Sequence, residues 1–270
     1  MHLEESVRII MADGTYKAVR DIEPDTDFLL DPHSLQPKKI PAPVVADGPV
    51  FRVYQTNGID YTVGHKQNIQ VIIVAPNSVT RKGKKPCNIT ILGEIHEKGD
   101  QLLLTPEEFI ALPRTVKEKK IRGTRVVPQY TQEPENPVDY HGLGAKFALD
   151  HIKTRSVLKA PKESRLDYLG GILESIGVTS DTDATSCYVK KVHPTVLDEI
   201  KGVSKTLGFR VTTTANRVRI TGNGVPGCRE YNNKKSTMHS KLVIETVGNA
   251  VCYEFPGVQG CFLEDYTVLG

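Results

Sequence analysis

The sequence predicts a mainly β fold, interrupted by a small insert that mixes helices and strands. Residues 6–73 consist of short runs of β-forming residues cut by turn residues, which is typical of antiparallel hairpins. From residue 139 to 208 the apolar residues recur at helical spacing instead. A Pro-rich polar stretch at 127–137 separates the β-type pattern from the helical one. We therefore expect three segments in the chain, of which the first and last form one β module: 1–130, 137–242 and 243–270.

In the first segment, turn residues and helix signals place the expected elements. Gly after Asp or Asn at 12–15 and 56–60 favours hairpin turns. The Lys-rich stretch 78–86 predicts an exposed loop, followed by a strand at 87–95. A Thr-Pro pair, two glutamates in the first turn and a basic ending predict one short helix within 105–123.

The expected insert contains three helices, with strands on either side of the last one. The spacing of apolar residues predicts helices at 139–152, 164–177 and 193–208. Strands are expected at 186–192 and 209–221. This is α/β structure inside an otherwise β chain.

The composition is typical of a globular protein without a membrane segment. Hydrophobic residues are 39% and charged residues 25% of the 270 positions, and no run approaches the roughly 18 apolar residues of a membrane span. The N-terminal residues lack the pattern of a secretory signal, so we expect a cytoplasmic or nuclear protein. We also expect it to be a monomer. The five scattered cysteines include no Cys-x-x-Cys pair, which predicts reduced thiols and no metal site.

The net charge of +3 is too small to indicate a nucleic-acid binder by itself. Basic residues nevertheless outnumber acidic ones between residues 146 and 241. This bias suits a phosphate-facing surface, although a solvated basic face is the commoner explanation.

Thr62 and His65 lie three positions apart, between two apolar runs. One interpretation is an ordinary hairpin, in which Gly64 supplies a positive φ and His65 faces water. The other is a site, because groups at the first and last positions of a turn can face one target.

Four stretches in order resemble the inteins, especially those of fungal nuclear genes. Residues 6–22, "SVRIIMADGTYKAVRDI", look like the first intein block, and 61–69, "YTVGHKQNI", like the second. The helix beginning "LTPEEF" and the closing "CFLEDYTVLG" at 261–270 complete the series. The resemblance implies the Hint horseshoe, a β fold in which both chain ends meet at the splice site. It also implies that His65 protonates the leaving amine and that Thr62 hydrogen-bonds the scissile peptide.

The junction residues depart from the intein pattern. The position of the usual N-terminal Cys falls on His2, whose imidazole cannot form the required ester. The family typically ends in His-Asn, whereas Asp265 and Thr267 near the end of this chain cannot replace the cyclising amide. The chain is therefore expected to be an engineered form or a natural stand-alone descendant, neither of which splices. A third alternative makes Cys252 an internal nucleophile, although a small buried hydrophobe is the simpler role for it.

The insert resembles a LAGLIDADG homing endonuclease, a family with paired helices that each deliver a metal-binding acid. Residues 165–177, "RLDYLGGILESIG", are similar to the second motif helix, where Gly170 and Gly171 would let two helices approach closely. Ile176 occupies the position of the catalytic acid, and Glu174 an earlier acidic position. In the candidate first motif Leu149 stands where the acid belongs, with Asp150 one step late, and one step turns a helical side chain by about 100°. We expect an endonuclease remnant that does not cut DNA.

Taken together, the sequence predicts an intein-type splicing domain with a degenerate insert. In a parental form His65 and Thr62 would catalyse self-excision from flanking host segments, without a cofactor. The alternative is a stand-alone DNA-binding protein, derived from an intein-encoded homing endonuclease, that binds duplex DNA weakly through the basic insert. A β-rich interaction module without activity is a third possibility.

Overall fold

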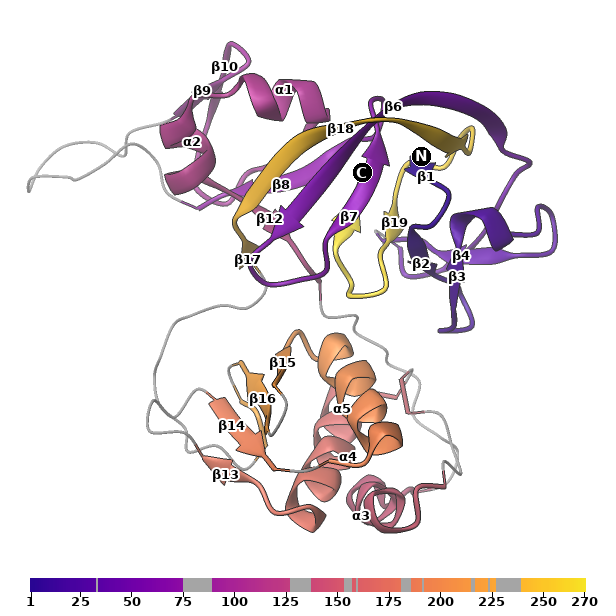
Figure 1. The fold of residues 1–270 in the computed structure, drawn as a ribbon, viewed down its shortest axis with the longest axis vertical. Coiled ribbons are helices and arrows are strands. Elements are labelled where there is room, and N and C mark those ends of the chain that lie inside the picture. Colours follow the sequence, from indigo (N-terminus) through magenta and orange to yellow (C-terminus); the bar gives the residue numbers. More distant parts are fainter. Residues whose placement is uncertain are drawn as a thin grey trace, which may run out of the picture. The chain divides into compact units, whose positions relative to one another are not determined.

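The computed structural model divides the chain into two compact units, which are described separately (Figure 1). Unit 1 consists of Met1–Arg125 and His239–Gly270, and unit 2 of Val126–Met238. The predicted loop at 78–86 and the Pro-rich stretch up to residue 136 lie outside the described residues. The structure describes these residues: 1–32, 34–74, 89–126, 137–152, 157–158, 160–180, 186–190, 192–214, 217–222, 224–226 and 239–270.

Four antiparallel strands of unit 1 close into a barrel (Figure 1). In order around the barrel they are β1 (His2–Glu4), β18 (Leu242–Glu254), β6 (Val44–Gln55) and β7 (Tyr61–Gly64). Strand β1 closes the barrel because it pairs with both β18 and β7. Side chains alternate across a strand, and the inward-facing Leu3, Val53 and Val63 are fully buried.

A second antiparallel sheet of unit 1 carries the C-terminal residues. Its strands, in order, are β17 (His239–Ser240), β12 (Ile121–Thr124), β8 (Ile69–Ile73), β20 (Val268–Leu269) and β19 (Cys261–Phe262), and β11 (Gln101–Leu104) also pairs with β8. Strands β7 and β8 follow one another in the chain. Because β7 pairs with β1 and Ile69 of β8 pairs with Leu269, the connection at 65–68 lies between the two ends of the chain.

Three hairpins complete the β structure in the described part of unit 1. They are β2 (Arg8–Ile10) with β3 (Tyr16–Ala18), β4 (Phe28–Leu30) with β5 (Pro37–Lys39), and β9 (Ile89–Ile91) with β10 (Glu94–His96), and a 3₁₀ helix η1 (Val19–Asp21) follows β3. The turn predicted at 12–15 is confirmed, with Gly14 at φ 85°. The single strand predicted at 87–95 is wrong, because Leu92 and Gly93 both adopt positive φ and fold it into a hairpin.

The predicted helix within 105–123 is two helices, α1 (Pro106–Ala111) and α2 (Arg114–Lys119). Thr105 caps α1 as expected: its hydroxyl accepts the Glu108 N–H, and the Glu108 carboxylate accepts the Thr105 N–H. The prediction missed the break at Pro113, which has no N–H for a continuing helix and restricts the residue before it to extended backbone.

In its described residues, unit 2 combines three helices with one antiparallel sheet, and it has a hydrophobic core of its own. The helices are α3 (Tyr140–Asp150), α4 (Lys162–Ser175) and α5 (Pro194–Thr206). Across the sheet the strands are β13 (Thr179–Ser180), β14 (Ser186–Val189), β16 (Arg217–Thr221) and β15 (Arg210–Thr214). The three predicted helices are confirmed to within a few residues at each end.

The chain is mainly β, as predicted. The return to the first unit occurs at His239 and not at residue 243, because Thr124 of β12 pairs with His239 of β17. Among the described residues, no helix has the length and apolar character needed to cross a membrane.

Candidate functional site

The peptide bond between Met1 and His2 is held at both of its polar atoms. The Met1 carbonyl oxygen accepts a hydrogen bond from the Phe255 backbone N–H at 2.8 Å. The His2 N–H donates to Oε1 of Gln67 at 2.7 Å. A donor on the carbonyl and an acceptor on the amide nitrogen both favour a polarised peptide.

The imidazole of His65 lies against the imidazole of His2. The two ring centroids are 5.3 Å apart and the rings meet edge to face. Among the described residues, neither Nδ1 atom has a hydrogen-bond partner, although both are buried. Burial, with a smaller contribution from His65, lowers the pKa of His2 below its usual 6.5, because a protonated ring loses solvation there.

Gly64 makes room for the His2 ring. A Cβ atom at position 64 would overlap that imidazole. The expectation that Gly64 supplies a positive φ is wrong: it lies within strand β7 and is absent from the positive-φ glycines. The absence of a side chain at position 64, rather than its conformational freedom, is what the site uses.

The C-terminal residues reach the same site through strand β20. Gly270 donates its N–H to the Asn68 carbonyl at 3.2 Å, and its carbonyl oxygen accepts from Nε2 of Gln67 at 2.6 Å. One side-chain amide therefore contacts both the His2 nitrogen and the Gly270 carbonyl. Figure 1 shows the two chain ends close together at the barrel.

Thr62 is the predicted partner of His65, and it pairs elsewhere. It lies opposite Arg52 in the β6–β7 ladder, and its hydroxyl accepts from Nη1 of that arginine at 3.4 Å. Its proposed contact with the scissile peptide stays a prediction.

Asp265 has structural partners for both of its carboxylate oxygens. Oδ2 accepts the Ile59 N–H at 2.9 Å and Oδ1 accepts the Thr267 N–H at 3.0 Å. The buried Arg125 guanidinium lies 3.7 Å from Oδ2 and also donates to the Asp265 carbonyl. These bonds attach the loop before β7 to the C-terminal strand, and a catalytic role for Asp265 stays untested.

Cys252 is fully buried in β18, where it pairs with Glu4 on one side and Ala46 on the other. Burial raises the pKa of its thiol, and the Glu4 and Asp47 carboxylates raise it further. A thiol that resists ionisation is a weak nucleophile. The geometry therefore favours the packing role over the alternative of an internal nucleophile.

Sequence reasoning missed Gln67 and Phe255. Gln67 stands two positions after His65, but its partners are 65 and 203 residues away in the chain. Phe255 acts through its backbone N–H, which any residue except proline would supply. A local signal for either contact is absent from the sequence.

In unit 2, helices α3 and α4 cross closely at two glycines. A Cβ atom at Gly144 would overlap the Tyr168 carbonyl, and one at Gly171 would overlap the His141 carbonyl. The predicted close approach is therefore correct for Gly171. A Cβ atom added at Gly170 would lie 3.5 Å from Pro226, an ordinary contact distance.

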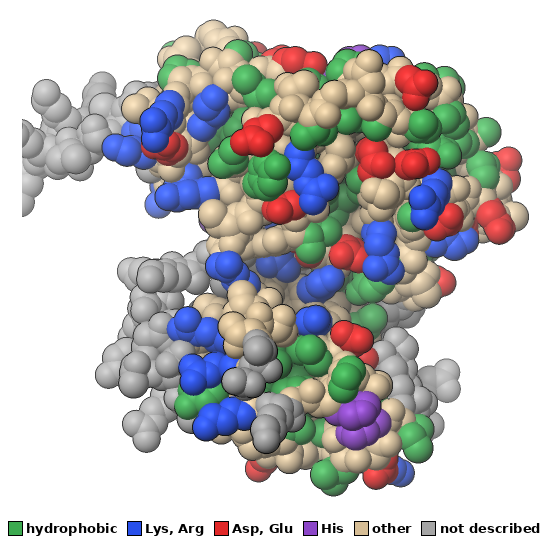
Figure 2. All heavy atoms as spheres, in the orientation of Figure 1, with side chains coloured by type: hydrophobic (Ala, Val, Ile, Leu, Met, Phe, Trp, Pro, Cys, Tyr) green, Lys and Arg blue, Asp and Glu red, His purple; other side chains and the backbone are tan. Residues whose placement is uncertain are grey.

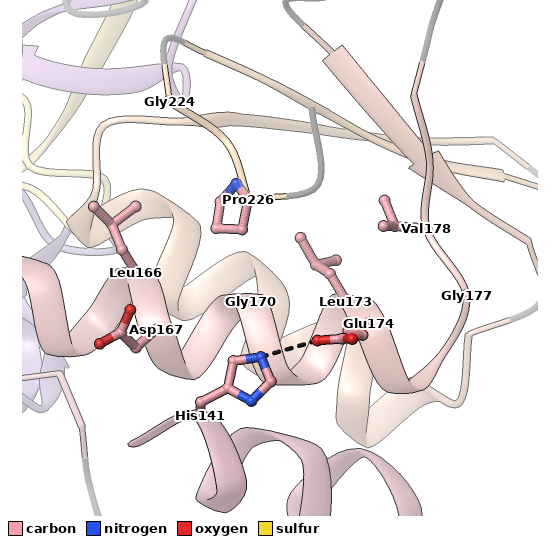
Figure 3. A pocket seen from close by; sticks show the side chains of 10 residues that line it. All are labelled: His141, Leu166, Asp167, Gly170, Leu173, Glu174, Gly177, Val178, Gly224 and Pro226. Carbon is pink, nitrogen blue, oxygen red and sulfur yellow. Dashed lines mark ion pairs between the residues drawn. The ribbon is translucent and has the colours of Figure 1, made fainter. Parts of the chain in front are cut away.

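Beside this crossing is an open cavity of about 520 Å³ (Figure 3). Its wall includes His141 of α3 and Glu174 of α4, whose Nε2 and Oε2 atoms are 3.0 Å apart. Asp167 lines the cavity further along α4. Glu174, the earlier acidic position, is thus paired with an imidazole.

The positions expected to carry the catalytic acids do not assemble a metal site. Leu149 is 69% exposed at the end of α3, and Ile176 is the C-cap residue of α4. Among the described residues, no group of three or more His, Cys, Asp or Glu side chains is placed to hold a metal ion.

Comparison with known proteins relates part of the chain to a protein family. A protein-family model described as homing endonuclease matches residues 157–250, which is less than half of the chain. The match covers α4, the sheet of unit 2 and α5, and it continues into β18 of unit 1. A search of curated proteins finds no match.

Proposed function

We propose that unit 1 is an intein-type Hint domain, built to rearrange the peptide bond before residue 2. One observation carries the proposal. The Met1–His2 peptide is bonded at its oxygen and nitrogen, the His2 ring lies against the His65 ring, and Gln67 contacts both this peptide and Gly270. The Phe255 bond continues the β1–β18 ladder, so the contacts that go beyond strand pairing are those of His65 and Gln67.

The chemistry is an acyl shift. A thiol at position 2 attacks the Met1 carbonyl carbon, the carbonyl oxygen becomes an oxyanion, and the amide nitrogen departs after taking a proton. The Phe255 N–H, 2.8 Å from that oxygen, stabilises the developing charge. The unpartnered Nδ1 of His65 supplies the proton to the leaving nitrogen.

With His2 in the nucleophile position, this chain does not form the ester and does not splice. The imidazole occupies the space beside Gly64 in which a cysteine side chain would stand. The site is thus a splicing site with its nucleophile replaced.

A direct test restores the nucleophile. An upstream reporter is fused to the full chain carrying His2→Cys, and an external thiol is added. We expect release of the reporter, because a thioester exchanges with free thiol whereas an amide does not. The companion variant His2→Cys/His65→Ala is expected to release it at least about 100-fold more slowly, the lower range for losing a general acid.

A folded His2→Cys chain that retains its reporter at all thiol concentrations would contradict the proposal. Circular dichroism and a cooperative thermal transition establish folding. Adding Asn and a nucleophilic residue after Gly270, followed by a downstream reporter, extends the test to ligation of the two reporters.

We infer further that unit 2 descends from a homing endonuclease and no longer cuts DNA. The family match at 157–250 and the close helix crossing support the descent. The side chains do not fit a divalent cation, because Ile176 provides no oxygen and Glu174 is paired with His141. No cleavage step is therefore assigned.

DNA binding by unit 2 is the second candidate function. Arg210, Arg217 and Arg219 are exposed on β15 and β16, and Lys and Arg side chains gather over the strands of this unit in Figure 2. The Arg217 guanidinium lies 4.3 Å from the centre of the Tyr188 ring. Such a surface suits phosphate contacts.

Gel-shift titration of the full chain at increasing salt tests this candidate. We expect weak binding that Arg217→Ser/Arg210→Ser reduces and salt abolishes. Lys17→Ser, a basic residue of unit 1 that forms an ion pair with Asp27, is the control. Absence of binding at low salt would remove DNA binding as a function.

A further inference from the structure

Gln67 is buried and uses its whole side-chain amide. It is 1% exposed. Oε1 accepts the His2 N–H at 2.7 Å, and Nε2 donates to the carbonyls of Gly270 at 2.6 Å and Asn68 at 2.9 Å. Its partners fix which amide atom is oxygen, because a backbone N–H requires an acceptor and a carbonyl requires a donor.

The position of Gln67 follows from the topology. It lies in the connection between β7, which pairs with β1, and β8, which pairs with β20. A side chain of its length is therefore centred between the residue-2 nitrogen and the residue-270 carbonyl. The His65 ring, two residues earlier, lies on the residue-2 side.

We propose that Gln67 is a catalytic and coupling residue of the splicing site, a role that rests on the proposed function of unit 1. Its Oε1 contacts the nitrogen that leaves in the acyl shift. Its Nε2 holds the strand that leads to the downstream junction. One side chain thus fixes the positions of the two junctions relative to each other.

The contact at the nitrogen favours the reaction and not only the ground state. As the thiol sulfur bonds to the Met1 carbon, a tetrahedral intermediate forms, in which the nitrogen gains a proton that balances the one lost by the thiol. That nitrogen is then positively charged and donates more strongly than an amide N–H, so its bond to Oε1 shortens and strengthens until the C–N bond breaks and the neutral amine leaves. A contact that strengthens along the reaction raises the rate.

The test uses the full chain with His2→Cys and an upstream reporter, as above. Gln67→Leu keeps the approximate volume and removes both polar atoms, and we expect reporter release at least about tenfold slower, the effect of one hydrogen bond lost in the transition state. Gln67→Glu restores the acceptor but, as a carboxylate, donates no hydrogen bond. It is expected to recover part of the release rate while failing in reporter ligation when the downstream junction is present.

Gln70→Leu is the matched control. Gln70 is also a buried glutamine, 7% exposed in β8, and its Nε2 donates to Oε1 of Gln101 at 2.6 Å. This variant loses a buried amide without touching either junction, so its release rate is expected to match that of the parent.

The outcomes separate the two proposals. Release by the His2→Cys parent at an equal rate with Gln67→Leu overturns the role of Gln67 and leaves the splicing proposal standing. Equal slowing by Gln67→Leu and Gln70→Leu also overturns it, because general destabilisation then explains the loss. A folded parent without release removes both.

Discussion

At the scale of single residues, the buried imidazole of His2 makes the stability of unit 1 depend on pH. Its pKa is lowered below 6.5 in the folded chain, mainly by burial and then by His65. As the pH falls through 6.5 the unfolded chain therefore binds more protons than the folded one, so acid destabilises the fold. Above that pH both states hold a neutral ring, and the contribution vanishes.

We expect His2→Gln to flatten this dependence. Between pH 7 and pH 5 the free energy of unfolding should fall less steeply in the variant, by at most about 1.4 kcal/mol per pH unit for one proton. Urea denaturation at several pH values measures the slope. Parallel curves for the two proteins would show that the His2 ring titrates normally in the folded state.

How well single residues could be predicted depended on the range of their interactions. His65 could be singled out because Thr-x-x-His is a local pattern, and its ring lies against that of His2, while its catalytic role stays a prediction. Gln67 could not be, because its hydrogen bonds are made to two partners that only the fold brings together. The contact of Gly64 with the His2 ring could not be predicted, because the two residues are distant in sequence.

At the scale of elements, the crossing of α3 and α4 depends on which glycine faces the partner helix. We expect Gly171→Ala to destabilise unit 2 by about 1–3 kcal/mol, because its methyl group would overlap the His141 carbonyl. Gly170→Ala, on the neighbouring position of the same helix, is the control.

Gly170→Ala should be neutral or stabilising by up to about 1 kcal/mol, because a helix gains from replacing glycine and Pro226 leaves room. Hydrogen exchange of peptides from α3 and α4 in the full chain reports both changes within unit 2. Equal protection in the two variants would contradict the crossing.

Local chemistry was enough to predict that a helix or strand exists, but not where it is interrupted. The helix start at Thr105 was predicted from its capping residues and is confirmed by reciprocal hydrogen bonds. The break at Pro113 is not part of the prediction, although a proline inside a helical pattern indicates one. The hairpin of β9 and β10 needs positive φ at Leu92, a conformation that a leucine does not signal.

At the scale of the whole molecule, unit 2 is inserted at a point where the first unit is already paired. Thr124 lies opposite His239 in an antiparallel ladder. We therefore expect a chain in which a turn of about four residues replaces 126–238 to fold, because hairpin connections of that length are common.

That shortened chain should show one cooperative thermal transition and, with His2→Cys, release an upstream reporter as the full chain does. Arg125 is kept because it contacts Asp265. A chain without cooperative melting would mean that unit 1 needs the insert to fold. The mainly β character was predictable from patterning, but this closure was not, because it pairs residues on both sides of the insert.

The contacts of the Gln67 carboxamide also bear on where flanking polypeptide would connect to unit 1. Polypeptide attached before residue 2 and after residue 270 would leave the surface within the span of one side chain. A protein that contained this chain of nearly thirty kilodaltons would therefore need to bring only two nearby chain ends together, as it does at the base of a short surface loop. Exposed loops are the sites where insertions are best tolerated.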